Sequence, residues 1–113
     1  MLRAVLDPGV LISAVISPRA APAALVRAWR ANHFELVVSP ALLDELMTVL
    51  LRSKFRRYLT EDQASSLVIE LETAGTKTDD PDDRPAVTAD PDDDYLVSLA
   101  IAAQADALIS GDR

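Results

Sequence analysis

Carboxylates stand at four places in this sequence where an apolar strand ends or a helix begins. Asp7 directly follows the apolar run 2–6, and Asp112 comes just after the run 107–110. Glu45 falls in the first turn of a helix, and the adjacent Asp93 and Asp94 open another. Gathered at one place, these acids would repel one another unless a cation lay between them. They therefore predict an all-oxygen site for Mg²⁺ or Mn²⁺, which suit such ligands better than zinc.

The elements that must bring these acids together are typical of an α/β protein. A near-continuous apolar strand such as 2–6 is buried on both faces, as in a parallel sheet covered by helices. Strands and helices then alternate, which predicts a three-layer α/β/α sandwich with a central, mostly parallel sheet in a single domain, residues 1–113. The carboxyl ends of such strands line one crevice. All four stretches are expected to deliver their acids there.

Local signals place the individual elements. Ser39 and Pro40 predict a helix start, with an apolar stripe from Leu42 to Leu51, and Thr60 with Gln63 forms a capping box for the next helix. Segment 76–87 reads as a loop with room for a short edge strand. The predicted strands are 2–6, 34–38 and 107–110, and the other predicted helices are 10–16, after a Pro-Gly turn, 23–31 and 93–104.

The composition fits a cytoplasmic protein. The chain has no cysteine, which excludes disulfides and thiolate metal sites, and no apolar run approaches the ~20 residues that cross a membrane. The net charge of −7 is local, because residues 79–94 hold eight aspartates and one arginine and the remaining ten acids and ten bases cancel. The total charge therefore does not argue against a nucleic-acid partner.

Four ordered motifs resemble the PIN-domain family, closest to the branch of toxin components of bacterial toxin–antitoxin systems (VapC-like). The resemblance spans essentially the whole chain. The motifs are the strand ending in Asp7, Ser-Pro-x-Leu-Leu-x-Glu-Leu from Ser39, Asp-Pro-Asp-Asp-Asp-x-Leu from Asp90, and Ala-Asp-Ala-Leu-Ile-Ser-Gly-Asp-Arg from Ala105.

The resemblance implies a metal-dependent endoribonuclease that hydrolyses RNA phosphodiesters with Mg²⁺ or Mn²⁺. It also implies a toxin that pairs with a cognate antitoxin protein, forms a homodimer and does not enter a membrane. Its first, second and fourth acids correspond to Asp7, Glu45 and Asp112. The third corresponds to Asp93, with Asp94 as the alternative. Ser110 and Asp90 are expected to support these ligands.

Two departures from the family pattern motivate a second hypothesis. Pro8 and Gly9 stand where relatives usually have Thr and Asn, and the chain stops at Arg113, where relatives usually continue through another helix and strand. The alternative is a catalytically impaired PIN remnant that binds protein or RNA. A partner or a second copy is expected to cover the open edge. A phosphatase or phospho-acceptor domain ranks last, because Gly9 occupies the position of its second acid.

Other polar residues admit plainer readings. The basic segment with Arg52, Lys54, Arg56 and Arg57 could bind RNA or could simply close the preceding helix with cations. The aspartates of 79–83 are predicted to be a solvated loop rather than part of the site. His33 is expected to be a surface or capping residue and Trp29 a core residue.

Overall fold

A computed structural model gives the structure of the chain; it describes residues 1–81 and 91–110, without the side chains of 91–94. Within this part, the elements alternate as an α/β protein requires. In chain order they are β1 (Arg3–Leu6), α1 (Pro8–Ile16), α2 (Ala21–Arg30), β2 (Glu35–Val38), α3 (Pro40–Leu50), the 3₁₀ turn η1 (Ser53–Phe55), α4 (Glu61–Ala74), β3 (Thr76–Lys77), α5 (Pro91–Ala102) and β4 (Ala107–Ile109).

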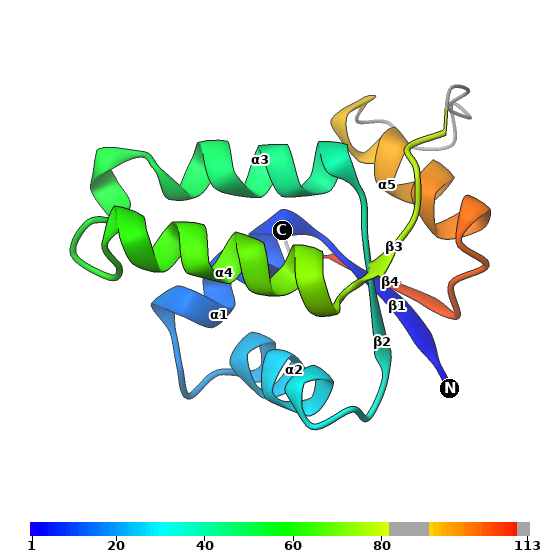
Figure 1. Ribbon diagram of the computed structural model, residues 1–113, viewed down its shortest axis with the longest axis horizontal. Helices are drawn as coiled ribbons and strands as arrows, with labels where there is room; N and C mark the ends of the chain where they lie inside the picture. The colour runs from blue at the N-terminus through cyan, green and yellow to red at the C-terminus, as the bar shows by residue number, and fades with distance from the viewer. Residues whose placement is uncertain (82–90, 111–113) are drawn as a thin grey trace.

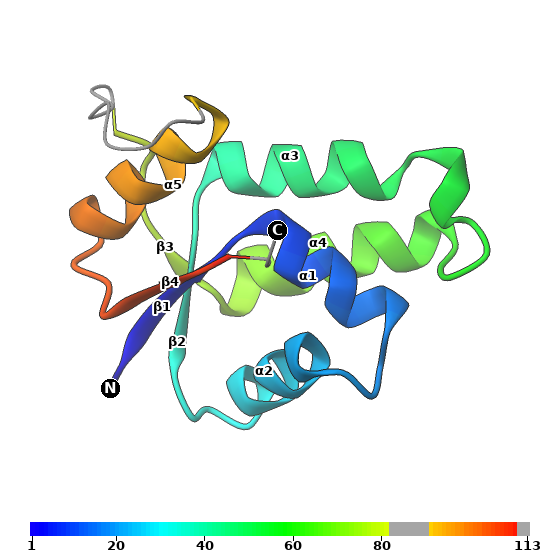
Figure 2. The same cartoon turned by 180° about the vertical axis from the view of Figure 1, so that it is seen from behind.

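The strands form one parallel sheet in the order β3-β2-β1-β4, with Val5 opposite Val37 on one side and Leu108 on the other. Figure 1 shows α5 on one side of the sheet and the other four α-helices on the opposite side. The view from behind in Figure 2 gives the same division. The predicted α/β sandwich with a parallel sheet is therefore confirmed, and its strands all end at the edge where α3 and α5 begin.

The two central strands explain why their sequences are nearly all apolar. Val5, Leu6 and Val37 are 0% exposed because helices cover both faces of β1 and β2. Trp29 packs into the same core, as expected, at 5% exposure. The core thus fixes β1, and with it the position of the residue that follows.

Helix starts follow the local signals closely. Ser39 caps α3 by accepting a hydrogen bond from Leu42 N at 3.2 Å, and Thr60 and Gln63 form the predicted capping box. The predicted Pro-Gly turn after β1 is wrong, because α1 begins directly at Pro8 with Asp7 as its N-cap. Proline is favoured at the first helical position, where its missing N–H costs nothing.

Leu51 lies outside the core, contrary to the predicted stripe, and Ile69 of the following helix is exposed as well. Leu51 follows the last turn of α3 and is 40% exposed, whereas Leu42, Leu46 and Leu50 are fully buried. Ile69 of α4 is 60% exposed because it lies half a turn away from the buried Leu71. The short edge strand allowed for in 76–87 exists as β3.

Among the described residues, no single helix has the length and apolar character needed to cross a membrane. The bent pair α1 and α2, which meet at 101°, reaches the threshold only when taken together.

Candidate functional site

Asp7 is held at the junction of β1 and α1. Its backbone N–H donates to Ile109 O of β4 at 2.9 Å, which fixes the end of the central strand. Its carboxylate oxygen Oδ1 accepts from Gly9 N at 2.8 Å, the N-cap bond of α1. A backbone N–H therefore orients this acid at the positions where the family usually supplies Thr and Asn side chains.

Glu45 lies in the second turn of α3, counting from Pro40, and reaches towards α5. Its Oε1 accepts a hydrogen bond of 2.6 Å from the hydroxyl of Tyr95. Glu45 is exposed, whereas Tyr95 is 8% exposed and belongs to the core. Tyr95 directly follows the aspartates that open α5, so this bond links the helix of the second family acid to the helix of the third.

Asp80 contradicts the prediction that the aspartates of 79–83 form a solvated loop. It is partly buried, and its Oδ2 accepts from Ala41 N at 2.8 Å in the first turn of α3. Its other oxygen, Oδ1, is buried and finds no hydrogen-bond donor among the described residues. Asp80 is drawn in because β3 pairs with β2 and directs the chain past the start of α3. Asp79, by contrast, is exposed.

Glu45, Asp7 and Asp80 all act electrostatically on the hydroxyl of Tyr95. Burial raises the pKa of Tyr95 above its ordinary value, and the hydrogen bond and charge of Glu45 and the charges of Asp7 and Asp80 raise it further. The phenol therefore stays protonated and remains a donor to Glu45. The charges of Glu45, Asp7 and Asp80, which come from three separate segments, thus act on one phenol of α5.

Asp90 and Asp112 lie outside the described residues, as do the side chains of Asp93 and Asp94. Ser110 is exposed immediately after β4. Within the described part, no group of three or more acids, histidines or cysteines is close enough to hold a metal ion. A complete ligand set would need acids from the start of α5 or from 111–113.

The residues that the structure does describe suit a hard divalent cation. The buried Oδ1 of Asp80 would gain a partner, and the donors are all carboxylate oxygens, which Mg²⁺ and Mn²⁺ favour. The two ion pairs found among the described residues, Arg3–Glu35 and Arg30–Glu70, leave Asp7, Glu45 and Asp80 without a basic partner. The donor chemistry therefore fits the group that the sequence predicts.

The basic segment lies at the opposite end of α3 from Ser39. Arg56 donates to the carbonyl oxygen of Leu50 and so closes the C-terminal end of α3, which favours the helix-end reading for this residue. Lys54 and Arg57 lie over the rings of Phe55 and Tyr58 at 5.2 and 5.5 Å. Arg52, Lys54 and Arg57 are exposed.

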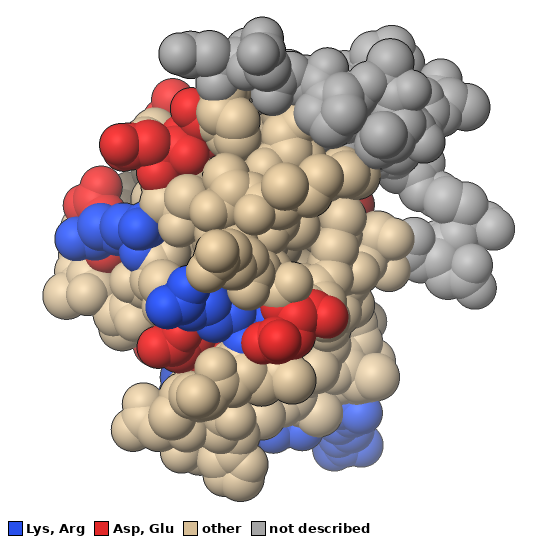
Figure 3. Space-filling view, turned by 90° about the vertical axis from the view of Figure 1, so that its right-hand side faces the viewer, with Lys and Arg blue, Asp and Glu red and all other residues tan. Residues whose placement is uncertain are grey.

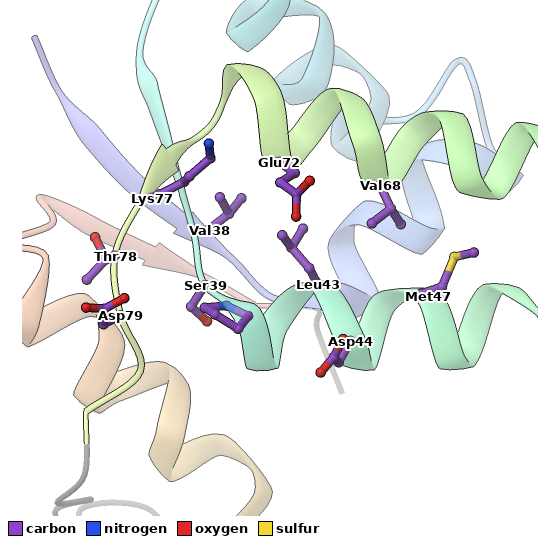
Figure 4. A pocket seen from close by; sticks show the side chains of 11 residues that line it. Val38, Ser39, Leu43, Asp44, Met47, Val68, Glu72, Lys77, Thr78 and Asp79 are labelled. Atoms are coloured by element: carbon purple, nitrogen blue, oxygen red, sulfur yellow. The ribbon is translucent and has the colours of Figure 1, made fainter.

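A cavity of about 420 Å³ opens between α3 and α4, beside β3. Figure 4 shows its apolar side chains, Val38, Leu43, Met47 and Val68, and a rim that carries Asp44, Glu72, Lys77 and Asp79. Glu45 is not among the residues that line it. The apolar lining and the excess of acids on the rim make this cavity a poor phosphate site.

On the side of the molecule that carries α5, the described surface has no large patch of one charge sign. Figure 3 shows a largely uncharged surface there, on which basic and acidic groups lie next to one another. A basic face that could hold a nucleic-acid backbone is therefore absent from the described surface in this view.

Comparison with protein families identifies the fold. A model of the PIN domain matches residues 3–113, nearly the whole chain. The chain belongs to the PIN-domain family. PIN domains are generally metal-dependent nucleases, which agrees with the carboxylate of Asp7 at the end of β1. A comparison with curated proteins found no match.

Sequence reasoning did not single out Asp80 or Tyr95 as site residues of this PIN domain. Asp80 is one of several aspartates in its segment, and nothing in the sequence distinguishes it from the others. Only the pairing of β3 with β2 brings it against the start of α3. Tyr95 carries a stronger signal, since an aromatic hydroxyl directly after a run of acids needs a partner when buried. That partner could not be found from spacing, because Glu45 lies 50 residues earlier.

Proposed function

We propose that this PIN domain is an endoribonuclease that hydrolyses RNA phosphodiesters with Mg²⁺ or Mn²⁺. The observation that carries the proposal is the hydrogen bond from Tyr95, directly after the aspartates of α5, to Glu45; the charge of Asp7 acts on the same phenol. Three stretches that carry the family's acids would thus supply ligands at one end of the sheet. Asp7, Glu45, Asp93 or Asp94, and Asp112 are the proposed ligands, with Ser110 and Asp90 in support.

Asp7, Glu45 and Asp80 would each have a role in this reaction. Asp7, oriented by Gly9 N–H, and Glu45, oriented by Tyr95, would hold the ion through oxygens whose positions are set before it binds. Bound there, a divalent ion supplies an activated water and offsets charge on the scissile phosphate. Asp80 adds negative charge behind them and fixes the start of α3.

The exposed cations Arg52, Lys54 and Arg57 are proposed as remote contacts to the RNA backbone. Glu45 lies about 7–8 Å from the end of α3 at ~1.5 Å per residue, and these cations lie beyond that end. At that distance they would hold a neighbouring stretch of the strand rather than the scissile phosphate. Arg56 is left out of this proposal because it caps α3.

The biological role proposed is that of a cytoplasmic toxin, neutralised by a cognate antitoxin and acting as a homodimer. Its support is the order of the four motifs, which resemble those of the toxin branch. Exposed apolar side chains on α5 and β4, Ile101 at 66% and Leu108 at 36%, are consistent with a covered surface. A short adjacent gene for a DNA-binding protein that relieves growth arrest on co-expression would support the role. Growth unaffected by the chain alone would count against it.

Cleavage of RNA in the presence and absence of Mn²⁺ tests the catalytic proposal. Asp7→Asn, Glu45→Gln, Asp93→Asn and Asp112→Asn should each reduce cleavage by at least ~100-fold, because each removes a proposed ligand charge. Asp44→Asn is the matched control, since Asp44 is exposed, adjacent to Glu45 and directed to the cavity between α3 and α4. Cleavage that persists in EDTA, or in all four variants, contradicts the proposal.

The rival function is a PIN domain that binds a protein or RNA without cutting it. Pro8 and Gly9 favour it, because they remove the side chains that usually support the first acid. Calorimetric titration with Mn²⁺ separates the two functions. Binding that is lost in Asp7→Asn supports the nuclease, and RNA binding without Mn²⁺ binding supports the rival.

A further inference from the structure

The hydroxyl of Tyr95, a core residue, donates a hydrogen bond to Glu45, an exposed acid. The residue is 8% exposed and packs in the core, and its hydroxyl donates to Glu45 Oε1 at 2.6 Å across the boundary between α5 and α3. A buried tyrosine hydroxyl needs a partner, and a carboxylate gives a shorter and stronger bond than a neutral acceptor. The bond therefore fixes a side chain that would otherwise move freely in solvent.

This hydrogen bond restricts the orientation of the Glu45 carboxylate. The tyrosine engages one carboxylate oxygen, and the second oxygen is held in a defined direction as a consequence. A free glutamate loses much of its rotamer freedom when it binds a ligand, and a prior hydrogen bond reduces that loss. Hydrogen bonds of this kind to ligating side chains are known to tune metal affinity in general.

We propose that Tyr95 is a positioning residue that orients Glu45 for the divalent cation. Tyr95 holds Oε1 and thereby presents Oε2 to the ion. This inference rests on the proposed metal-dependent function and names a residue that the ligand set does not contain.

The test uses Tyr95→Phe, which keeps the buried ring and removes only the hydroxyl. Mn²⁺ affinity is measured by calorimetry for the unaltered chain, Tyr95→Phe, Glu45→Gln and the double variant. Tyr95→Phe should weaken binding about 10- to 100-fold. In the Glu45→Gln background the same change should alter affinity less than about twofold, because Tyr95 acts through Glu45. Tyr58→Phe, at the chain's other tyrosine, should leave affinity unchanged.

A second measurement needs no metal and serves if the Glu45→Gln chains bind Mn²⁺ too weakly for calorimetry. The carboxyl carbons of glutamate are labelled for NMR, and the Glu45 signal is assigned as the signal that is absent from the spectrum of Glu45→Gln. It should move in Tyr95→Phe without added metal, and a stationary signal overturns the proposal.

Three further outcomes overturn it at different levels. Equal Mn²⁺ affinity in the unaltered chain and Tyr95→Phe refutes the positioning role alone. An equal loss with and without Glu45 shows that the hydroxyl acts by another route. If the unaltered chain binds no Mn²⁺, the metal-dependent function fails, and the inference fails with it.

Discussion

Asp80 Oδ2 accepts a hydrogen bond of 2.8 Å from the backbone N–H of Ala41, in the first turn of α3. The first N–H groups of a helix have no partner within the helix, and a negative charge there also complements the helix dipole. Ser39 satisfies another of these donors, that of Leu42. Two side chains from separate segments thus secure the start of the helix that carries Glu45.

Removing Asp80 should separate its acceptor role from its charge. We expect Asp80→Ala to lower the free energy of unfolding by about 0.5–2 kcal/mol, the usual cost of a lost N-terminal cap. Asp80→Asn should cost less, because an amide oxygen can still accept from Ala41 N–H. Urea denaturation measures both, with Asp79→Asn as the exposed control. Equal losses for the alanine and asparagine variants would show that charge, not the hydrogen bond, is the larger contribution.

Restoring the usual family residues after Asp7 should strengthen cation binding. We expect Pro8→Thr with Gly9→Asn to raise Mn²⁺ affinity several-fold, since two polar side chains would join the backbone N–H that orients Asp7. The position has room, because a Cβ at residue 9 would lie 3.4 Å from Asp7 Oδ1, an ordinary contact. Gly9→Ala, which adds only a methyl group, should give no gain in calorimetry. No gain in the double variant would show that the Gly9 N–H already suffices.

The ion pair between α2 and α4 should make stability depend on pH. Arg30 donates to both oxygens of Glu70, at 2.9 and 2.8 Å, and these hydrogen bonds lower the pKa of Glu70 below its ordinary value of 4.5. A lowered pKa in the folded chain stabilises it above pH 4.5, and this contribution is lost as pH falls through the lowered value. Both side chains are largely exposed, so the effect is at most about 0.2–1 kcal/mol.

We therefore expect Glu70→Gln to be less stable than the unaltered chain at neutral pH and equally stable in acid. Denaturation at a series of pH values measures the difference, and Glu72→Gln on the same helix is the control. A difference that does not change with pH would rule out the ionised pair as its cause.

Gln104 holds a conformation that glycine adopts more easily. Its φ is 53°, and it follows the end of α5, where Ala105 N–H donates to Ala100 O in a helix-ending turn. A left-handed backbone conformation costs a residue with a Cβ about 1–2 kcal/mol. Glycine avoids this strain, but it loses more conformational entropy on folding, which offsets part of the gain. Gln104→Gly should thus add about 0.5–1 kcal/mol in thermal denaturation. Asn32→Gly, at φ 64°, should add less, because asparagine tolerates this region. A destabilised Gln104→Gly chain would contradict the expectation.

The sequence predicted what local chemistry determines. Ser39 caps α3 and Pro40 takes its first helical position, and Thr60 with Gln63 forms the capping box of α4 within four residues. The buried character of β1 and β2 was also readable, because an apolar run with no alternation demands cover on both faces. The edge at which Asp7 stands follows from that sheet.

The remaining features depend on contacts between distant segments. Asp80 and Asp79 are equivalent in sequence, and only the pairing of a two-residue strand with β2 buries one and exposes the other. Arg56 could bind RNA or close a helix by its charge alone, and its contact with Leu50 O distinguishes the two. The Pro8-Gly9 pair predicts a turn, and the helix start at Pro8 depends instead on how α1 leaves the strand with Asp7 as its N-cap.

The pairing of β1 with β4 has a consequence for how the chain is made. Arg3 N donates to Asp106 Oδ2 at 2.8 Å across 103 positions, and Asp7 N reaches Ile109 O in the same ladder. Such high contact order slows folding, because a long loop must close before the contact forms. A chain that has not yet formed β4 holds β1 by one neighbour only, so the end of β1 at Asp7 is fixed only when the distant β4 joins the sheet.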